Sequence, residues 1–539
     1  MKHRKILFVQ PEHTTSYWGF QYSLRLYGKK TMHPPLGLIT VAAMLPKHWD
    51  LRLIDCNIET LTDEDVLWAD MVWTGGMGTQ VKSMYAVLDR CRALGRKTVI
   101  GGPHATGHKP VDRADYLVLN EAEVTLQPFL DDLEKGCPKQ VYEDATKPDV
   151  TSTPVPRFDL LNVNAYGVMD IQYSRGCPFN CEFCDIIALY GRVPRTKTPA
   201  QTVAEFQALY DLGYRGALFL VDDNFIGNKK SVKDMLELLT PWMQKHEYPF
   251  FLTTEASINL ADDDGLLEAM RLSGFKRVFL GIETPSMEAL KETQKFQNTK
   301  REMVESVHHM QSFGIECMGG FIVGFDSDEA NIFDRQIQFI TQAELPWAMV
   351  GILAAIPLTQ LWDRLQREDR LLGYHSGDQF GGTNFKTKMA PDELMDGYKK
   401  ILRTIYEPRS YFDRVLAVVK RQVDVGYPNL HKKLTGFAKI GAATIVSMVI
   451  QGVFSSYRRE YWRFMYQLLT QYRKKYVVGL MNSIVGHHFI KYTDKILKEA
   501  EQRTAYAPIK PIDRQHPTYK EVAALTKIVK SAAAASSHS

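Results

Sequence analysis

The sequence predicts an α/β protein with three parts: a doubly wound parallel sheet, a partial (β/α)6 barrel that resembles part of a TIM barrel, and a helical region. Short apolar runs alternate with helical stretches over the first 125 residues, the alternation resumes after residue 165, and strand signals stop near residue 385. Strands separated by helices imply right-handed crossovers and therefore parallel sheets. We expect an N-terminal domain over 1–135, a linker over 136–164, a barrel over 165–385, a helical domain over 386–505 and a tail over 506–539.

The first alternation predicts an N-terminal sheet. Its expected strands are 5–9, 51–55, 71–76, 97–102 and 115–123, with helices over 36–45 and 81–94. Ligands of such sheets bind at the carboxyl ends of the strands. Two glycine-rich loops follow these ends, TGGMGTQ (74–80) and GGPHATG (101–107), and glycine lets the backbone approach a large ligand closely.

The second alternation follows a polar, proline-containing stretch that reads as a linker. Its strands are expected to end at Tyr173, Val221, Thr254, Leu280, Val323 and near Ala355. One intervening helix is well marked, because Thr198 suits the N-cap, Pro199 suits the first turn and Gly213 suits the end. Six such units predict an open barrel with its site at the carboxyl ends of the strands.

Composition narrows the class of protein. The net charge is only +4, which gives no reason to expect a nucleic-acid partner. Seven cysteines, an odd number, do not suggest a disulfide framework, so we expect a reducing, cytoplasmic environment. The apolar run near the N-terminus is too short for a signal peptide. The uncharged stretch 440–457 is diluted with polar residues and predicts a buried or interfacial helix.

Three of the seven cysteines stand in SRGCPFNCEFCDI (174–186), as Cys177, Cys181 and Cys184. Four thiolates would complete a structural zinc site or saturate an iron–sulfur cube, whereas three leave one iron of a [4Fe–4S] cluster open to another ligand. None of the remaining cysteines is an obvious fourth ligand. A zinc knuckle that borrows a histidine is the alternative.

At these residues the chain resembles the radical S-adenosylmethionine (radical SAM) superfamily, in the Cys-x3-Cys-x2-Cys spacing, in Phe183 before the last cysteine and in the βα units. The resemblance implies a [4Fe–4S] cluster whose open iron is chelated by S-adenosylmethionine. It also implies reductive cleavage to a 5′-deoxyadenosyl radical, with electrons from a reductase such as flavodoxin or ferredoxin. In such enzymes the cofactors carry the chemistry and the protein places them.

The same resemblance points to further cofactor-binding residues. Asp222, Asp223 and Asn224 end the second barrel strand, where the family binds the methionine amine; a solvated turn is the alternative. Glu255 and Glu283 stand at strand ends and suit ribose hydroxyls or polarisation of the site. Gly320, in GGFIVGFD (319–326), matches the adenine-contacting segment, although its glycines equally suit strand–helix packing.

The N-terminal sheet resembles the cobalamin-binding domain of cobalamin-dependent members of this superfamily. The resemblance places Thr74, Gly75, Gly76, Gly101 and Gly102 against the corrin and its nucleotide tail. The family's cobalt-ligating Asp-x-His-x-x-Gly pattern is missing, because the loop after the first strand reads PEHTTSYWG. We therefore assign neither His13 nor His104 as a cobalt ligand. A vestigial or nucleotide-binding sheet is the alternative.

Together the two domains imply a cobalamin-dependent radical methyltransferase. One S-adenosylmethionine would methylate the cobalamin, and a second would give the radical that removes hydrogen from an unactivated carbon, which then receives the methyl group. Two other functions fit the same architecture: a cyclase or oxidoreductase without net methyl transfer, and a non-catalytic cobalamin or redox sensor.

The chain also resembles a subgroup that has a helical C-terminal extension and includes the hopanoid C-2 methylases. The resemblance covers four stretches: HPPLGLITVAAMLP (33–46), GRVPRTKTPAQ (191–201), VDDNFIGNKK (221–230) and RREYWRFMYQLL (458–469). This resemblance implies a small-molecule substrate that is a hopanoid or another lipid.

The extension itself leaves two interpretations open. Residues 451–500 hold nine Lys/Arg against three Asp/Glu, interleaved with Tyr457, Tyr461, Trp462, Phe464 and Tyr466. Such a stretch suits peripheral contact with an anionic membrane surface, at the inner face of the membrane. It equally suits a helical bundle that packs on the barrel with its charges solvated. The final SAAAASSHS is of low complexity and expected to be disordered.

Overall fold

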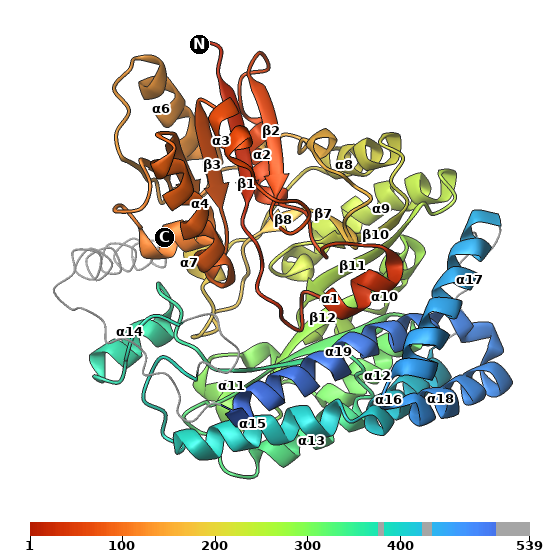
Figure 1. Ribbon diagram of the computed structural model, residues 1–539. Coiled ribbons are helices and arrows are strands. Elements are labelled where there is room, and N and C mark those ends of the chain that lie inside the picture. Colours follow the sequence, from red (N-terminus) through yellow and green to blue (C-terminus); the bar gives the residue numbers. More distant parts are fainter. Residues whose placement is uncertain (376–381, 423–433, 503–539) are drawn as a thin grey trace.

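The computed structural model describes residues 1–375, 382–422 and 434–502 (Figure 1). Within these ranges two six-stranded parallel sheets and a set of C-terminal helices are arranged in chain order, which confirms the predicted fold class. The tail expected over 506–539, including SAAAASSHS, lies outside the described residues.

The N-terminal sheet is parallel throughout, with the strand order β2-β1-β3-β4-β5-β6. Its strands are β1 (Lys5–Gln10), β2 (Asp50–Asp55), β3 (Met71–Gly75), β4 (Lys97–Gly101), β5 (Tyr116–Val118) and β6 (Val141–Tyr142). Its helices are α2 (Leu36–Ala43), α3 (Asp63–Trp68), α4 (Val81–Ala93), α5 (Gly102–His108) and α6 (Ala122–Glu134). Strand β6 was not anticipated, since it falls within the expected linker.

Both faces of this sheet are buried, as a doubly wound sheet requires. In β1 the side chains alternate: Ile6 and Phe8 pack in one apolar cluster, and Leu7 and Val9 pack in another. Because both clusters need apolar residues, the strand reads as a continuous run, KILFV, rather than as an alternating one.

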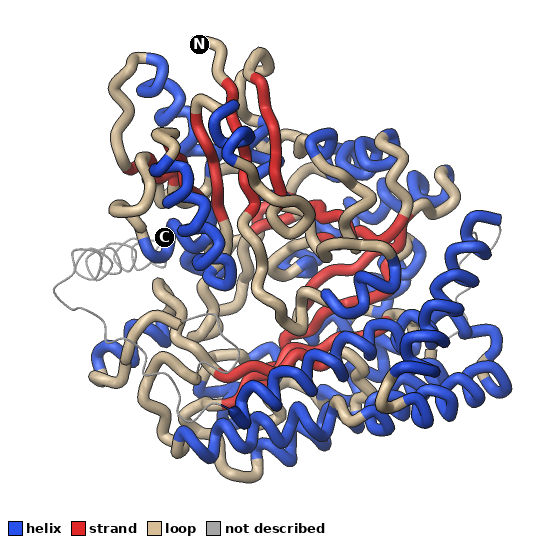
Figure 2. Tube along the Cα trace, in the orientation of Figure 1, coloured by secondary structure: helices blue, strands red, loops and turns tan. Residues whose placement is uncertain are grey.

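The central sheet has the sequential order β14-β13-β12-β11-β10-β7, all parallel, as expected for an open half-barrel (Figure 2). Its strands are β7 (Val168–Ile171), β10 (Gly216–Leu220), β11 (Phe250–Ala256), β12 (Phe275–Glu283), β13 (Glu316–Val323) and β14 (Ala348–Ile352). Its helices are α8 (Pro199–Asp211), α9 (Lys229–Lys245), α10 (Asp264–Leu272), α11 (Met287–Glu292), α12 (Met303–Ser312) and α13 (Ile332–Gln342). A two-stranded ribbon, β8 (Ser174–Arg175) with β9 (Arg195–Thr196), and the short helix α7 (Ile186–Tyr190) lie beside its first strand.

The start of α8 confirms the predicted cap. Thr198 accepts a hydrogen bond from the backbone N–H of Gln201, and the Gln201 side chain accepts one from the backbone N–H of Thr198. This capping box, with Pro199 in the first turn, fixes where the helix begins. Gly213 follows the helix with φ +79°, a conformation that favours glycine.

The C-terminal helices cover one end of the central sheet. They are α14 (Gln360–Arg367), α15 (Pro391–Ile405), α16 (Pro408–Arg421), α17 (Leu434–Val449), α18 (Arg458–Gln471) and α19 (Tyr476–Gln502), with a π-helical turn at Ile450–Phe454 after α17. No helix among the described residues combines the length and apolarity needed to cross a membrane.

Burial settles which aromatic residues of this region face outward. Tyr457, Tyr461 and Phe464 are buried in the main core, whereas Trp462 and Tyr466 are exposed. The expectation that all five lie at a membrane surface is therefore wrong for three of them. Those three pack as the bundle interpretation requires.

The segment between β1 and α2 (residues 11–35) leaves the N-terminal sheet and contacts the far end of the chain. It contains the short helix α1 (Gln21–Leu24), which packs against α19 (Figure 1). The hydroxyls of Tyr17 and Thr493 lie 2.6 Å apart, and Tyr492 donates to the carbonyl of Thr15 at 2.9 Å. We call residues 11–35 the crossover segment.

Candidate active site

The carboxyl ends of the two sheets meet. Arg175, which ends β8, pairs with Glu121 at 2.8 Å and with Glu123 at 2.9 Å, and both carboxylates follow β5 of the N-terminal sheet. Arg195 pairs with Glu121 from the other strand of the ribbon. These four side chains are nearly buried, so the pairs fix the two sheets relative to each other. We call this region the junction.

The three cysteines occupy the loop between β8 and α7, at the junction. Cys177 donates its backbone N–H to the carbonyl of Gly191 at 3.2 Å, and Cys184 donates to the carbonyl of Cys181 at 3.1 Å. None of the three forms a disulfide, and Cys181 is buried. Burial raises the pKa of the Cys177 and Cys184 thiols, so a positive centre is needed to hold them as thiolates.

One side of the cysteine loop is attached to the segment after α11. Glu182 donates its backbone N–H to the carbonyl of Thr293 at 3.0 Å. The Asn180 amide donates to Gln294 at 2.7 Å and accepts from Gln360 at 3.0 Å. The loop geometry is thus set by residues more than a hundred positions away in the chain.

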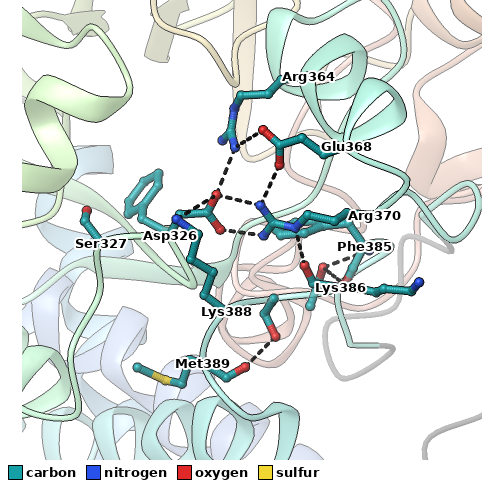
Figure 3. Close-up of polar contacts among 12 residues, drawn as sticks. Asp326, Ser327, Arg364, Glu368, Arg370, Phe385, Lys386, Lys388 and Met389 are labelled. Atoms are coloured by element: carbon teal, nitrogen blue, oxygen red, sulfur yellow. Dashed lines mark hydrogen bonds and ion pairs between the residues drawn. The ribbon is translucent and has the colours of Figure 1, made fainter.

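Arg364, on α14, connects the cysteine loop to the loop after β13 (Figure 3). Its guanidinium donates to both carboxylate oxygens of Glu182, at 2.6 and 3.2 Å. It also donates to Asp326 at 2.8 Å, as Figure 3 shows. Arg370 binds the same Asp326 carboxylate with two hydrogen bonds, at 2.5 and 2.7 Å. Burial opposes the charge of Asp326, but the two arginines outweigh it and lower its pKa to about 2. The ion-pair network therefore stays charged at neutral pH.

The donors around the thiols suit sulfur that carries negative charge. Asn224 directs its amide toward the Cys177 sulfur at 3.8 Å, and Gln297 directs its amide toward the Cys181 sulfur at 3.7 Å. Among the described residues no three His, Cys, Asp or Glu side chains converge closely enough to hold one metal ion. A cubane cluster binds each thiolate through a different iron, so it needs a wider spacing than zinc does. The donor set fits a cluster better than a zinc knuckle.

Asp222 and Asp223 follow β10 beside the cysteine loop, with Asp222 buried and Asp223 partly exposed. Asp222 accepts a hydrogen bond from the backbone N–H of Ser174, and its second carboxylate oxygen has no partner. Asp223 accepts from the backbone N–H of Gly176 at 2.8 Å. Burial raises the pKa of Asp222 to about 7 and that of Asp223 to about 6. A cation bound here would lower both pKa values, and the burial of Asp222 argues against a solvated turn at that residue.

Asn224 is nearly buried and binds the end of β11 as well as the cysteine loop. Its carbonyl oxygen accepts the backbone N–H of Ser257 at 3.2 Å. Asp222, Asp223 and Asn224 therefore all bind the cysteine loop or the residues just before it, at Ser174, Gly176 and Cys177.

Glu255 and Glu283 end β11 and β12 and have different surroundings. Glu255 is partly exposed, and burial together with the nearby Asp223 raises its pKa to about 7. Glu283 is nearly buried and accepts from the Lys295 ammonium at 2.5 Å. Its φ of +64° is unusual for a residue with a side chain, and the register with β13 shifts at this point. The strained turn directs Glu283 to Lys295.

Lys295 was not anticipated from the sequence. It is nearly buried, and although burial opposes its charge, Glu283 and the thiols of Cys181 and Cys184 keep its pKa raised. Its ammonium lies 5.9 Å from the centre of the Phe183 ring. Phe183 also packs on Phe325, so the ring links the cysteine loop to the loop after β13.

Gly320 lies in β13 beside Gly281 of β12. A Cβ at position 320 would come within 2.7 Å of the Phe279 ring. Gly320 thus allows the Phe279 ring of the neighbouring strand to pack closely on β13.

The carboxyl edge of the N-terminal sheet is formed by glycine backbone. A Cβ at Gly75 would lie 2.9 Å from the carbonyl oxygen of Gly101, and one at Gly101 would lie 2.9 Å from that of Val118. Gly102 adopts φ +84° and passes close to Gly76. Thr74 is buried and donates to the carbonyl of Val9 at 2.8 Å. The edge is a close-packed backbone surface, which fits a large flat ligand such as cobalamin.

Neither His13 nor His104 presents a free ring at this edge. His104 is buried, lies 3.1 Å from the Tyr85 hydroxyl and stacks on His108 at 4.2 Å. Burial lowers the pKa of His104 to about 3 and that of His13 to about 4. Both rings are therefore neutral at pH 7, and the cobalt ligand stays unassigned.

The crossover segment adds a histidine that the sequence analysis did not single out. His33 Nδ1 lies 3.0 Å from Asp170 Oδ1 of β7, and its ring lies 5.5 Å from the Phe219 ring. Burial alone would lower the pKa of His33, but Asp170 outweighs it and raises the pKa. Trp18, 45% exposed, meets the Phe279 ring edge-on at 4.9 Å. The crossover segment thus adds a polar pair and an aromatic contact beside the central sheet.

Comparisons with known proteins agree with this division of the chain. Residues 29–130 match the B12 binding domain, residues 171–334 match the radical SAM superfamily, and residues 359–502 match a domain of unknown function. The chain is 39% identical to the uncharacterized methyltransferase sll1242 of Synechocystis sp., over 92% of this chain and 93% of the relative. It is 33% identical to the hopanoid C-2 methylase of Rhodopseudomonas palustris, over 91% and 93%.

A solved structure shares the fold. The radical S-adenosylmethionine methyltransferase TsrM from Kitasatospora setae, with cobalamin and a [4Fe–4S] cluster bound, has a TM-score of 0.55 and 12% identity, over 68% of this chain and 75% of that chain. The two sheets therefore stand in an architecture that accommodates both cofactors in another protein.

Proposed function

This chain belongs to the cobalamin-dependent radical SAM methyltransferases, and we propose that it transfers a methyl group to an unactivated carbon of a hopanoid or another lipid. The family uses a [4Fe–4S] cluster, S-adenosylmethionine and cobalamin. The observation that carries the proposal is the junction, where ion pairs from Arg175 to Glu121 and Glu123 hold the glycine edge of one sheet against the cysteine loop of the other.

The bound cofactors supply a methyl donor and a radical that removes a hydrogen atom; the chain holds and orients them. We assign Cys177, Cys181 and Cys184 as the ligands of three cluster irons. The amides of Asn224 and Gln297 direct hydrogen bonds at two of the sulfurs and stabilise their charge. Arg364 and the Thr293 carbonyl hold Glu182, and thereby the loop, in place.

Asp222 is assigned to the amino group of S-adenosylmethionine. Its unpartnered, buried oxygen is an acceptor without a donor, and an ammonium supplies the missing hydrogen bond and the compensating charge. Asp223 holds the loop at Gly176, and Glu255 and Glu283 offer carboxylates to the ribose or the sulfonium. Gly320 and Phe183 bound the space for the adenine.

Thr74, Gly75, Gly76, Gly101 and Gly102 are assigned to cobalamin. Close backbone packing at this edge gives a surface without projecting side chains, and a side chain at Gly75 or Gly101 would force the strands apart. No protein histidine is assigned to the cobalt.

The lipid assignment rests on two supports. The chain is 33% identical, over nearly its whole length, to a hopanoid C-2 methylase. In addition, Trp18, Phe219 and Phe279 give the junction aromatic surface, which suits an apolar substrate better than a charged one. His33 and Asp170 supply a polar pair for a hydroxyl or a released proton.

The test is an anaerobic assay of the protein reconstituted with iron, sulfide and cobalamin. S-adenosylmethionine labelled on its methyl group, a strong reductant and a hopanoid extract are added, and the products are analysed by mass spectrometry. We expect label on cobalamin, 5′-deoxyadenosine, S-adenosylhomocysteine and a singly methylated lipid. An electron donor such as flavodoxin or ferredoxin should replace the chemical reductant.

The other outcomes separate the alternatives. Deoxyadenosine without label on cobalamin favours a cyclase or oxidoreductase. The absence of both products favours a sensor. Label on cobalamin with no methylated lipid keeps the methyltransferase and rejects the lipid as its substrate.

A further inference from the structure

We propose that the hairpin formed by α17, its π-helical turn and α18 is a docking surface for an anionic lipid bilayer. The docking surface rests on the proposed function, because an enzyme that methylates a lipid must reach the bilayer that holds it. It rests on side chains that lie away from the junction and play no part in cofactor binding.

The outward face of α17 is apolar where a surface helix normally is polar. Ile445, Val449 and Val453 recur at intervals of four residues, so they lie along one side of the helix and its π-helical turn. They are 64%, 43% and 57% exposed, and Phe454 at the end of the turn is 78% exposed. A single exposed apolar residue needs no explanation, but a continuous stripe does.

The opposite face of α17 already has its protein partner. Ile440, Ala443 and Val446 pack on Leu480 and Ile484 of α19. The exposed stripe is therefore not the face that packs α17 against the rest of the protein. Residues 440–457 carry no charge, so the helix is apolar on both sides.

A second apolar stripe on α18 continues the first. Trp462, Tyr466 and Leu469 share one face and are 44%, 69% and 45% exposed. The two stripes join where the Trp462 indole donates to the carbonyl of Gly452 at 2.9 Å. Figure 1 shows α17 and α18 together at the margin of the molecule, on the side away from the N-terminal sheet. We call the seven side chains of the two stripes and Phe454 the apolar patch.

Composition and charge identify the occupant. Tryptophan and tyrosine are the side chains that suit the boundary between lipid headgroups and acyl chains. Arg458 and Arg459 are exposed directly after the π-helical turn, and residues 451–500 hold nine Lys/Arg against three Asp/Glu. A protein partner would need a matching apolar surface. An anionic bilayer can bury the apolar patch among its lipids and attract the arginines beside it with its headgroups. The patch lies on the surface, in agreement with the finding that no described helix can cross a membrane.

The test uses the full chain and vesicles made of equal parts phosphatidylglycerol and phosphatidylcholine. Sedimentation with the vesicles should be strong, should weaken with salt and should be much weaker with phosphatidylcholine alone. The double variant Ile445→Ser/Phe454→Ser should lower the partition coefficient by one to two orders of magnitude, since each side chain loses its burial in lipid. Arg458→Gln/Arg459→Gln should lower it about fivefold per arginine, and only on the anionic vesicles.

Leu238→Ser is the matched control, because Leu238 is 45% exposed on α9, outside the patch. It should bind vesicles as the unaltered chain does. All three variants should cleave S-adenosylmethionine normally without lipid. Loss of vesicle binding with normal cleavage would therefore leave the proposed function intact, and loss of cleavage with normal vesicle binding would leave the docking surface intact.

Two results would overturn the proposal. One is equal vesicle binding by the Ile445→Ser/Phe454→Ser and Leu238→Ser variants. The other is an unaltered protein that self-associates and does not bind vesicles, together with an Ile445→Ser/Phe454→Ser variant that is monomeric. That result would mean that a second copy of the chain covers the patch.

Discussion

The carboxyl edges of the two sheets are built in different ways, one from glycine backbone and the other from buried charged side chains. At the N-terminal sheet the edge is backbone, with Gly75 and Gly101 so close that a Cβ on Gly75 would lie 2.9 Å from the Gly101 carbonyl oxygen. At the central sheet the edge is made of buried charge, with Asp222, Lys295 and Glu283 around the cysteine loop. Under the proposed assignments, the large flat ligand would be held by shape, whereas the small charged ligand and the cluster would be held by paired charges.

Replacing one thiol should have the largest effect, and on one edge alone. Cys184→Ala leaves two ligands, so we expect the cluster to be lost and methyl transfer and deoxyadenosine formation to fall to background. Iron and sulfide analysis after reconstitution measures the loss, and cobalamin binding should be unchanged. Cys137→Ala removes an exposed thiol and is the control. Full iron content in Cys184→Ala would remove that residue from the ligand set.

Breaking the buried Glu283–Lys295 pair should have the next largest effect. In Lys295→Met the Glu283 carboxylate is left buried and unpaired, which costs roughly 3 to 5 kcal/mol of unfolding free energy. Urea unfolding of the cofactor-free protein measures it.

The matched control for this pair is Lys233→Met, which breaks an ion pair with Asp263 in which the lysine is 46% exposed. This loss should stay below about 1 kcal/mol. Similar losses in the two variants would mean that burial does not distinguish charge at the junction from charge on the surface.

A pH series should sharpen the comparison further. Glu255 has a pKa of about 7 in the folded protein against an ordinary value of 4.5, so folding is penalised as pH rises from 4.5 to 7. Glu255→Gln removes that penalty. The cofactor-free variant should match the unaltered protein at pH 4.5 and exceed it by about 2 to 3 kcal/mol at pH 8. Thermal unfolding across this range measures it, and a constant difference at every pH would contradict the assignment.

The smallest expected effect is on the glycine edge. Gly75→Ala places a Cβ against the Gly101 carbonyl, and the strand shift should weaken cobalamin binding about tenfold, or about 1.4 kcal/mol. Gly78→Ala lies in the same loop with nothing within 4 Å of its Cβ, so it should bind normally. A cobalamin titration followed by protein fluorescence compares them. Iron content should stay full in both, which keeps this result separate from the cysteine edge.

The fold was predictable because its signals are local. Strand and helix periods are set by neighbouring residues, as in KILFV and in the Thr198–Pro199 helix start, and both were confirmed. Strand β6 was missed because Val141 and Tyr142 alone give no period. The three cysteines were equally readable, since their spacing is confined to eight positions.

The remainder of the site depends on contacts between distant residues. Glu182 and Arg364 are 182 positions apart, and His33 and Asp170 are 137 apart, so neither pairing leaves a mark in the sequence. Lys295 looks like any solvated lysine until the fold buries it. The aromatic residues of α18 are a different case: Tyr457, Tyr461 and Phe464 follow helical spacing on one face, which distinguishes them from Trp462 and Tyr466. Attention to that period would have predicted which ones are buried.

The crossover segment has a consequence for how the protein is made. Tyr17 and its partner Thr493 are separated by 476 positions, which at about 5 to 20 residues per second means about 24 to 95 seconds of translation. The N-terminal sheet can form on the ribosome within that time, but the contacts of Thr15 and Tyr17 with α19 can form only after α19 has emerged. The crossover segment is therefore among the last parts of the molecule to reach its final place.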